Sequence, residues 1–202
     1  MSGPSHDPET LAFYDREAAT YAGRRLAKGS SGLADFMAQL PTRGHVLDLG
    51  CGGGQDSEVL LANGFRVTPL DGSRALAQIA ETRLGQPVRV QLFEDLDDQL
   101  AFDGILANAS LLHVPLDRLG SVLARVFCAL KPGGVFHASY KAGEGGARDT
   151  LGRYFNFPSQ DDLTEIYAQS APWMALDIRQ REGHSYEQAL RTWLLVRAVK
   201  PA

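Results

Sequence analysis

The sequence has few of the features that mark secreted, membrane-spanning or duplex-binding proteins. Its 202 residues include only two cysteines, Cys51 and Cys128, too few for a disulfide framework and without zinc-site spacing. No apolar run approaches the roughly 18 residues of a membrane-spanning helix, and the N-terminus lacks the basic and apolar regions of a secretory signal. The net charge is −4, whereas duplex-binding domains carry a clustered basic excess. We therefore expect a cytoplasmic protein with no membrane or nucleic-acid partner and no bound metal.

The amino-acid composition is that of an ordinary globular domain. Hydrophobic residues make up 44% and charged residues 22% of the chain, and its length suits a single domain. We expect this domain to comprise an N-terminal helical cap (residues 1–42), a central core (43–140) and a C-terminal part (141–202).

The cap is expected to hold two helices. Asp7 is a good N-cap before a proline, so a first helix should cover residues 8–23. Ser30 or Ser31 should cap a second helix that reaches about residue 40.

Short apolar runs alternate with longer amphipathic ones through the core. Strands are expected at residues 45–49, 65–70, 88–93, 102–108 and 134–140. Helices are expected at 56–63, at 74–85 with Ser73 as its cap, and at 116–130. This alternation predicts βαβ units and a parallel sheet. A glycine-bearing lid loop over residues 141–158 and a helix capped by Ser159 should follow. Two strands are then expected near residues 173–179 and 192–200, and their short link indicates antiparallel pairing. The expected fold is an open α/β sheet that ends in an antiparallel hairpin.

The string DLGCGGG, residues 48–54, follows the first expected strand. A dinucleotide fingerprint fails here, because Gln55 and Ser57 stand where a third glycine is needed. Asp48, two residues before the first glycine, argues against a phosphate and for a positively charged ligand. Asp71 closes the second expected strand, where a carboxylate can accept both hydroxyls of a ribose. A cationic nucleoside with free ribose hydroxyls describes S-adenosylmethionine.

Four strings carry a resemblance to a known family: VLDLGCGGG (46–54), VTPLDGS (67–73), FDGILANASLLHV (102–114) and LKPGG (130–134). Over residues 42–140 the chain resembles the class I S-adenosylmethionine-dependent methyltransferases. It looks most like the small bacterial branch that includes tellurite-resistance-type and other small-molecule enzymes. The resemblance implies a three-layer Rossmann-like sandwich with a seven-stranded, mostly parallel sheet. It also implies methyl transfer to a small molecule by in-line displacement, with S-adenosylhomocysteine as the product.

The same resemblance implies a set of cofactor contacts. Asp71 would hold the ribose, and a backbone N–H beside Glu94 or Asp95 would meet adenine, the register between these two being open. The full expected set is Asp48, Gly50, Cys51, Gly52, Asp71, Gly72, Ser73, Glu94, Asp95, Leu96, Asn108, Ala109 and Ser110.

Residues for the chemistry come from segments near the carboxyl ends of the strands. His113 is a candidate general base if the acceptor must lose a proton. Tyr14 and Tyr21, on one face of the first expected helix, are candidates to touch the methionine part or the acceptor. Further candidates are the cofactor-carboxylate partners Arg24 and Arg25, the acceptor contacts Tyr140 and Lys141, and the lid residues Arg148, Arg153, Tyr154 and Asn156.

Each of these features also has a structural interpretation. The glycines can form a plain tight turn, Asp71 can cap a helix, His113 can bond local backbone, and the two tyrosines can be core. Two other functions stay open, a non-catalytic binding module and an NAD(P)-dependent oxidoreductase. The acceptor and the oligomeric state are not indicated by the sequence.

Overall fold

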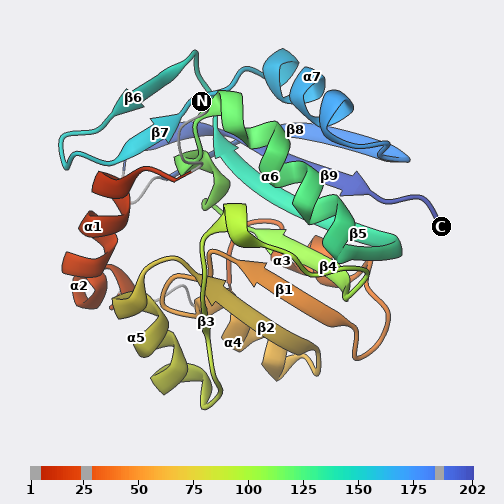
Figure 1. Cartoon of the computed structure of the whole chain (residues 1–202), viewed down its shortest axis with the longest axis horizontal. Coiled ribbons are helices and arrows are strands. Elements are labelled where there is room, and N and C mark those ends of the chain that lie inside the picture. The colour runs from red at the N-terminus through yellow and green to blue at the C-terminus, as the bar shows by residue number, and fades with distance from the viewer. Residues whose placement is uncertain (1–5, 24–28, 185–188) are drawn as a thin grey trace.

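Seven strands form one sheet in the order β3-β2-β1-β4-β5-β9-β8 in the computed structural model, which describes residues 6–23, 29–184 and 189–202 (Figure 1). In sheet order they are β3 (Arg89–Val90), β2 (Arg66–Asp71), β1 (His45–Leu49), β4 (Phe102–Ala107), β5 (Leu130–Lys141), β9 (Leu190–Val199) and β8 (Ala175–His184). β3, β2, β1, β4 and β5 pair in parallel, whereas β9 is antiparallel to β5 and β8. The expected fold class, with its terminal antiparallel hairpin, is confirmed.

Helices cover both faces of this sheet. The α-helices are α1 (Pro8–Arg16), α2 (Ala18–Ala22), α3 (Leu33–Met37), α4 (Gln55–Ala62), α5 (Arg74–Leu84), α6 (Leu116–Ala129) and α7 (Gln160–Ser170), and two 3-10 turns are η1 (Phe93–Asp95) and η2 (Leu111–His113). Strand β1 shows the two layers, because neighbouring side chains point to opposite faces. Leu47 and Leu49 pack in the core that includes α6 and α7, and Val46 packs with α3 and α4. None of the helices in the described ranges is long and apolar enough to cross a membrane.

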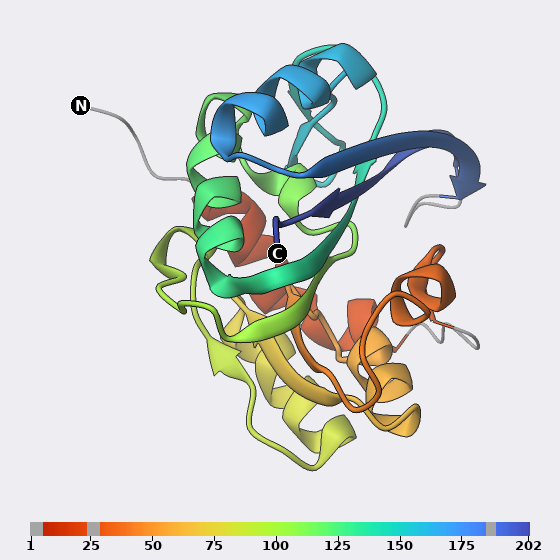
Figure 2. The same cartoon turned by 90° about the vertical axis from the view of Figure 1, so that its right-hand side faces the viewer.

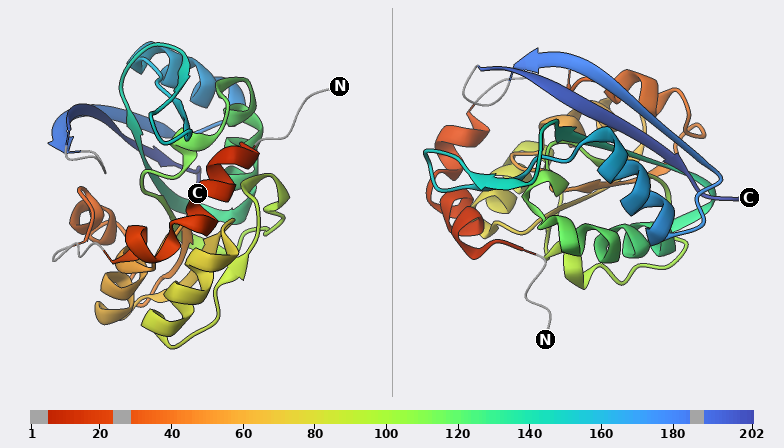
Figure 3. Two further views of the ribbon diagram at one scale, coloured as in Figure 1. Left: turned by 90° about the vertical axis from the view of Figure 1, so that its left-hand side faces the viewer. Right: turned by 90° about the horizontal axis from the view of Figure 1, so that it is seen from above.

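The strand order reverses between β1 and β4, which are neighbours in the sheet although β2 and β3 lie between them in the chain. The loops that leave their carboxyl ends therefore run in opposite directions, and such a switch point opens a crevice for ligands. The helices α1 and α2 lie over this edge (Figure 3). Ala22 touches the glycine-rich loop after β1, where a Cβ added to Gly53 would lie 2.6 Å from Ala22 Cβ.

Several local signals act as expected. Asp7 accepts a hydrogen bond from Thr10 N–H, and Ser73 accepts one from Leu76 N–H. Ser159 forms a full capping box with Asp162 at the start of α7. These side chains satisfy backbone donors that the first helical turn leaves unpaired.

Four expected elements differ from the structure. The first expected helix is two helices, separated at Glu17, where ψ is 11°. The second begins after Gly32, whose φ of 86° needs a glycine, so neither expected serine caps it. The third strand is only Arg89–Val90, because both side chains are exposed at the sheet edge and the chain turns into η1. The segment 141–158, expected as a loop, contains a hairpin of β6 (Gly146–Arg148) and β7 (Tyr154–Asn156).

The terminal hairpin is longer than expected. β9 pairs with β5 as far as Trp193 and Lys141, and it continues along β8 to the pair of Leu190 and His184. The additional length makes an arm that curves away from the sheet toward α3 (Figure 2). Arg181 near the tip donates a 2.5 Å hydrogen bond to Ser31 Oγ, so the arm is fastened to the segment before α3.

Candidate functional site

The glycine-rich loop after β1 presents bare backbone at the switch point. Gly50 and Gly52 have φ values of 84° and 54°, conformations that side chains rarely adopt. The N–H groups of Gly50 and Cys51 donate to the Leu70 carbonyl at the end of β2. A Cβ at Gly50 would lie 2.4 Å from Ser110 Cβ, so the glycine allows the loops after β1 and β4 to touch.

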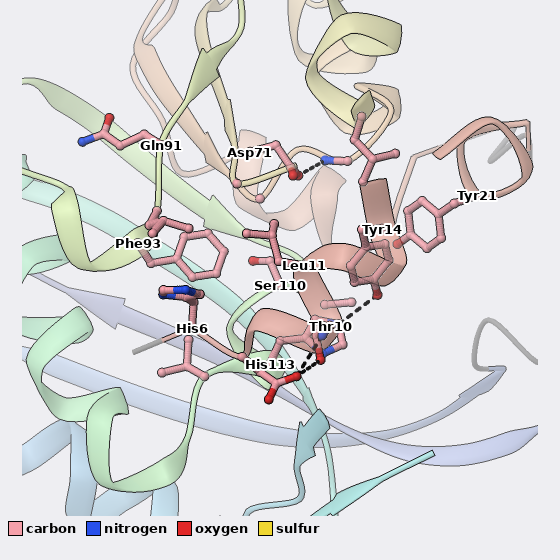
Figure 4. Close-up of a pocket in the computed structure, with 18 of the residues that line it drawn as sticks. His6, Thr10, Leu11, Tyr14, Tyr21, Asp71, Gln91, Phe93, Ser110 and His113 are labelled. Atoms are coloured by element: carbon pink, nitrogen blue, oxygen red, sulfur yellow. Dashed lines mark hydrogen bonds between the residues drawn. The ribbon is translucent and has the colours of Figure 1, made fainter. Parts of the chain in front are cut away.

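Asp71, the last residue of β2, holds this loop against the start of α5. Its Oδ2 accepts the Gly52 N–H at 2.8 Å (Figure 4). Its Oδ1 accepts the Ser73 N–H, also at 2.8 Å. Burial raises the pKa of Asp71 to about 6, so the group is mostly ionised at pH 7. An ionised carboxylate has about four lone pairs, so two backbone bonds leave acceptor capacity for a ligand.

A first cavity opens beside Asp71 at the switch point. Its polar lining comes from the glycine loop, Asp71 and the loop after β4. Apolar side chains make the walls: Leu11, Leu76, Leu92, Phe93 and Val114 (Figure 4). The cavity therefore combines a carboxylate, bare backbone and apolar walls that suit a flat ring.

A second, wider cavity of about 860 Å³ adjoins the first, within the range of roughly 300–1,000 Å³ for small-molecule sites. The two share the residues Tyr14, Tyr21, Gly50, Gly52, Asn108, Ala109 and His113. Strands β5, β9 and β8 wall its far side with Ser139, Lys141, Leu195, Trp193 and Arg181. Two ligands, one in each cavity, would meet at the shared wall.

The structure brings most of the predicted cofactor contacts to these cavities. Gly50, Gly52, Asp71, Gly72, Asn108, Ala109 and Ser110 line the first, and Asp48 and Cys51 line only the second. Ser73 lines neither, because it is fully buried as the cap of α5. The cap also bonds to α1, since Ser73 Oγ donates to Asp15 Oδ1 at 2.6 Å.

The segment after β3 is displaced from the expected register. Gln91, Leu92 and Phe93 line the first cavity, whereas the predicted contacts Glu94, Asp95 and Leu96 do not. The 3-10 turn η1 causes this, because it buries Leu96 in the core, leaves Asp95 exposed and lets Glu94 contact His6 Nδ1 at 3.0 Å. β3 ends earlier than the apolar pattern of residues 88–93 predicts, and this pattern therefore contains no sign of the shift.

Two carboxyls lie at the β1–α4 end of the second cavity. Asp48 Oδ2 accepts the Ser57 hydroxyl at 2.6 Å, and Asp56 Oδ1 accepts the Ser30 N–H at 2.8 Å. Burial, with the nearby Asp56 charge, raises the pKa of Asp48 to about 7. Burial also raises the pKa of Asp56. A cation near these groups would favour their ionised forms.

Tyr14, Tyr21 and His113 meet in the wall between the cavities. The rings of the two tyrosines pack edge to face at 5.0 Å, and Tyr14 Oη lies 2.9 Å from His113 Nε2 (Figure 4). His113 Nδ1 lies 2.6 Å from the Tyr154 carbonyl oxygen, which can only accept, so Nδ1 carries the proton. Nε2 of the neutral ring then accepts from the Tyr14 hydroxyl. Burial lowers the pKa of His113 to about 4.

The remaining predicted site residues separate into two groups. Lys141 and Arg153 line the second cavity, and His113 bonds the Tyr154 backbone. Tyr140 does not reach it, because its buried hydroxyl bonds Tyr167 in the core. Two others also point elsewhere: Arg148 pairs with Asp7 and Glu9, and Asn156 donates to the carbonyls of Leu111 and Val114. Arg24 and Arg25 lie outside the described residues.

The chain is similar to known proteins of one family. A family model described as a methyltransferase domain matches residues 18–192. A Paramagnetospirillum magneticum protein named ubiquinone biosynthesis O-methyltransferase is 37% identical over 136 residues, which cover 64% of this chain and 50% of that protein. A Paracidovorax citrulli trans-aconitate 2-methyltransferase is 34% identical, with coverage of 69% and 51%. The chain thus spans about half the length of these curated relatives.

Solved structures extend the similarity over the whole chain. The Burkholderia thailandensis 1,6-didemethyltoxoflavin-N1-methyltransferase, solved with 1,6-didemethyltoxoflavin and S-adenosylhomocysteine, is 25% identical at a TM-score of 0.71. The match covers 100% of this chain and 94% of that one. A Methanosarcina mazei structure described as a SAM-dependent methyltransferase has a TM-score of 0.74 at 21% identity, covering 82% and 96%, and supports the fold alone.

Proposed function

Because the chain belongs to the methyltransferase family that this domain model describes, we propose that it transfers a methyl group from S-adenosylmethionine to a small-molecule acceptor. The observation that carries the proposal is Asp71. This carboxylate closes β2, accepts the N–H of Gly52 in the glycine loop with one oxygen and the N–H of Ser73 before α5 with the other, and lines the first cavity.

The residues of the first cavity fit the cofactor that the sequence indicates. Asp71 keeps acceptor capacity for ribose hydroxyls after its two backbone bonds. Leu11, Leu92 and Phe93 offer apolar surface to a flat base. Asp48, at the adjoining end of the second cavity, offers a negative charge to a cationic group. The S-adenosylhomocysteine named for the Burkholderia structure agrees with this cofactor class.

When bound, S-adenosylmethionine supplies a methyl group on a positively charged sulfur, a good leaving group. The contribution of this chain is to hold the two reactants in line and to exclude water. Tyr14 and Tyr21 lie in the wall that both cavities share, where they would orient an acceptor. His113 is a positioning residue in this proposal, because its Nε2 is engaged by Tyr14 and its low pKa makes it a weak base at pH 7.

The second cavity is proposed as the acceptor site. It adjoins the first across the tyrosines and is lined by charged and aromatic side chains from β5, β8 and β9. The curated relatives named for ubiquinone biosynthesis and trans-aconitate methylation support a small-molecule acceptor. Membership of the tellurite-resistance-type branch stays a prediction from the sequence.

Calorimetric titration of the purified chain tests the proposal. S-Adenosylmethionine and S-adenosylhomocysteine should bind, and NAD and NADP should not, because the loop after β1 lacks the third glycine that a pyrophosphate needs. The opposite preference would contradict the proposal and favour an oxidoreductase. Transfer of a labelled methyl group to a component of a metabolite extract would then separate an enzyme from a binding module.

A further inference from the structure

Tyr14 lies where the two cavities meet, and its hydroxyl has two hydrogen-bond partners in the cavity walls. Its Oη lies 2.9 Å from His113 Nε2, and the Arg153 guanidinium hydrogen bonds the Tyr14 side chain. Tyr14 and His113 line both cavities, and Arg153 lines the second. These two partners fix which hydrogen bonds the hydroxyl can still make with a ligand.

The proton of the Tyr14 hydroxyl is already engaged. His113 Nδ1 lies 2.6 Å from the Tyr154 carbonyl oxygen, which can only accept, so the neutral ring presents a bare Nε2 to Tyr14. Burial lowers the pKa of His113 to about 4, and the ring is therefore neutral at pH 7. The Tyr14 O–H donates to this Nε2 and is not available to a ligand.

The lone pairs of the phenol oxygen are what remains. A guanidinium has donors and no acceptor, so Arg153 uses one lone pair of the Tyr14 oxygen. A hydroxyl oxygen has two lone pairs, and one is left. Burial raises the pKa of Tyr14 well above its usual range, so the group is a phenol and not a phenolate base. Toward a ligand, Tyr14 is therefore a hydrogen-bond acceptor only.

Such an oxygen distinguishes between the groups that a ligand can place at the shared wall. An ionised carboxylate also has only lone pairs, so beside the Tyr14 oxygen it would lose hydrogen bonds with water and gain none. An O–H or N–H group would donate to the remaining lone pair. Because a buried charge without a partner costs more than a hydrogen-bonded neutral group, this part of the wall favours a donor.

Resting on the proposed function, we infer that Tyr14 selects the methyl acceptor: its phenol oxygen accepts a hydrogen bond from the O–H or N–H group that becomes methylated. The bond from that oxygen or nitrogen to the methyl carbon forms as the carbon–sulfur bond breaks, and the electron pair of the broken bond stays on sulfur. The displaced proton passes to water, since the Tyr14 oxygen and His113 Nε2 are already hydrogen bonded to each other. A carboxylate is not the methylated group.

The direction of the hydrogen bond is tested first. In protein that carries nitrogen-15 histidine and is saturated with S-adenosylhomocysteine, nitrogen NMR should show the His113 proton on Nδ1 and none on Nε2. His113→Asn identifies these signals by their loss. A proton on Nε2 would leave the Tyr14 O–H free to donate to a ligand, and the inference would be overturned.

The chemical class of the product is the second test. Carbon-13 methyl-labelled S-adenosylmethionine is incubated with the chain and a metabolite extract, and the carbon NMR shift of the transferred methyl group is read before and after mild alkali. Alkali releases methanol from methyl esters and leaves ethers and N-methyl groups intact. We expect an ether or an N-methyl group. A methyl ester or a thioether would overturn the inference and leave the proposed methyl transfer standing.

Tyr14→Phe removes the phenol oxygen and keeps the ring. The rate of methyl transfer should fall about threefold to tenfold in dilute extract, the value of one hydrogen bond, and should recover in concentrated extract, because the oxygen binds the methyl acceptor. Tyr140→Phe is the matched control: it also removes a buried hydroxyl, bonded to Tyr167 outside both cavities. This control should leave the rate unchanged.

Calorimetry with S-adenosylhomocysteine separates this inference from the proposed function. Tyr14→Phe should keep the cofactor affinity of the unaltered chain within about twofold. An equal loss of cofactor affinity and rate, or an unchanged rate, would overturn the inference alone. If Tyr14→Phe does not fold, the histidine tautomer and the product class still decide. If the unaltered chain transfers no label or binds no S-adenosylhomocysteine, the proposed function is contradicted and the inference fails with it.

Discussion

The Tyr14 hydroxyl donates a 2.9 Å hydrogen bond to His113 Nε2, across 99 positions of the chain. The direction follows from the 2.6 Å contact between His113 Nδ1 and the Tyr154 carbonyl, which fixes the imidazole tautomer. One histidine thereby joins α1, η2 and β7 in the wall between the two cavities. His113 places the phenol of Tyr14, which lines both cavities.

The first prediction concerns the titration of His113. Its pKa is lowered to about 4 by burial, so its imidazole NMR signals should not shift between about pH 8 and pH 5, unlike those of an ordinary histidine with a pKa near 6.5. His113→Asn identifies the signal and keeps an N–H for the Tyr154 carbonyl. A midpoint near pH 6.5 would contradict the lowered pKa and restore His113 as a candidate base.

The same shift predicts how stability depends on pH. The unfolded imidazole, with a pKa near 6.5, binds more protons than the folded one, so His113 contributes full stability above about pH 6.5 and loses it as pH falls through about 4. Chemical denaturation should show a loss of roughly 2–3 kcal/mol over this window. His113→Asn should lose less over it. An identical pH slope in both proteins would contradict the shifted pKa.

Asp71 should govern cofactor affinity more than protein stability. We expect Asp71→Asn to weaken S-adenosylhomocysteine binding by about tenfold to a hundredfold, the value of one charged hydrogen bond. Asp15→Asn is the matched control, because Asp15 also accepts from Ser73 and lies outside both cavities. Calorimetry and thermal denaturation compare the two. Equal losses of affinity would mean that Asp71 only positions the start of α5.

The parallel core could be predicted from the sequence because its signals are local. Apolar runs of strand length and caps such as Ser73 and Ser159 act within a few residues of themselves. The end of β3 could not be predicted, since Val88 and Val90 read as strand although only Leu70 and Asp71 offer pairing partners at that edge.

The site could be predicted only in part for a similar reason. Gly50, Gly52 and Asp71 come from two adjacent strands, and their motif spacing predicted one cavity wall. The contact between Tyr14 and His113 depends on packing between distant segments, which no local pattern encodes. Polar residues near the tip of the terminal hairpin favoured a loop. The length of the hairpin, and hence the position of Arg181, could therefore not be predicted.

Asp48 should make cofactor binding depend on pH. Its pKa is raised to about 7 and that of Asp71 to about 6, so both carboxyls become neutral as pH falls from 8 to 5. A cationic ligand needs them ionised, and the affinity for S-adenosylmethionine should therefore fall over this range by about tenfold or more. Asp48→Asn should flatten the upper part of the profile while Asp71 preserves the lower part. If Asp48→Asn leaves the pH profile of the affinity unchanged, the charge of Asp48 does not act on the bound cofactor.

Arg153 should be the most sensitive point of the β6–β7 hairpin. Its side chain is 1% exposed, its Nη2 lies 2.6 Å from Asp149 Oδ2, which accepts from the guanidinium, and its Cζ lies 5.0 Å from the centre of the Phe13 ring and 5.1 Å from that of the Phe155 ring. Removing the carboxylate from a buried pair costs about 3–5 kcal/mol, whereas replacing the cation by an apolar group of similar length costs less. We therefore expect Asp149→Ala to lower the free energy of unfolding by about 3 kcal/mol and Arg153→Met by roughly half of that. Urea denaturation at pH 7 measures both, and a larger loss for Arg153→Met would show that the guanidinium, through its stacking on the two rings, matters more than the charge pair.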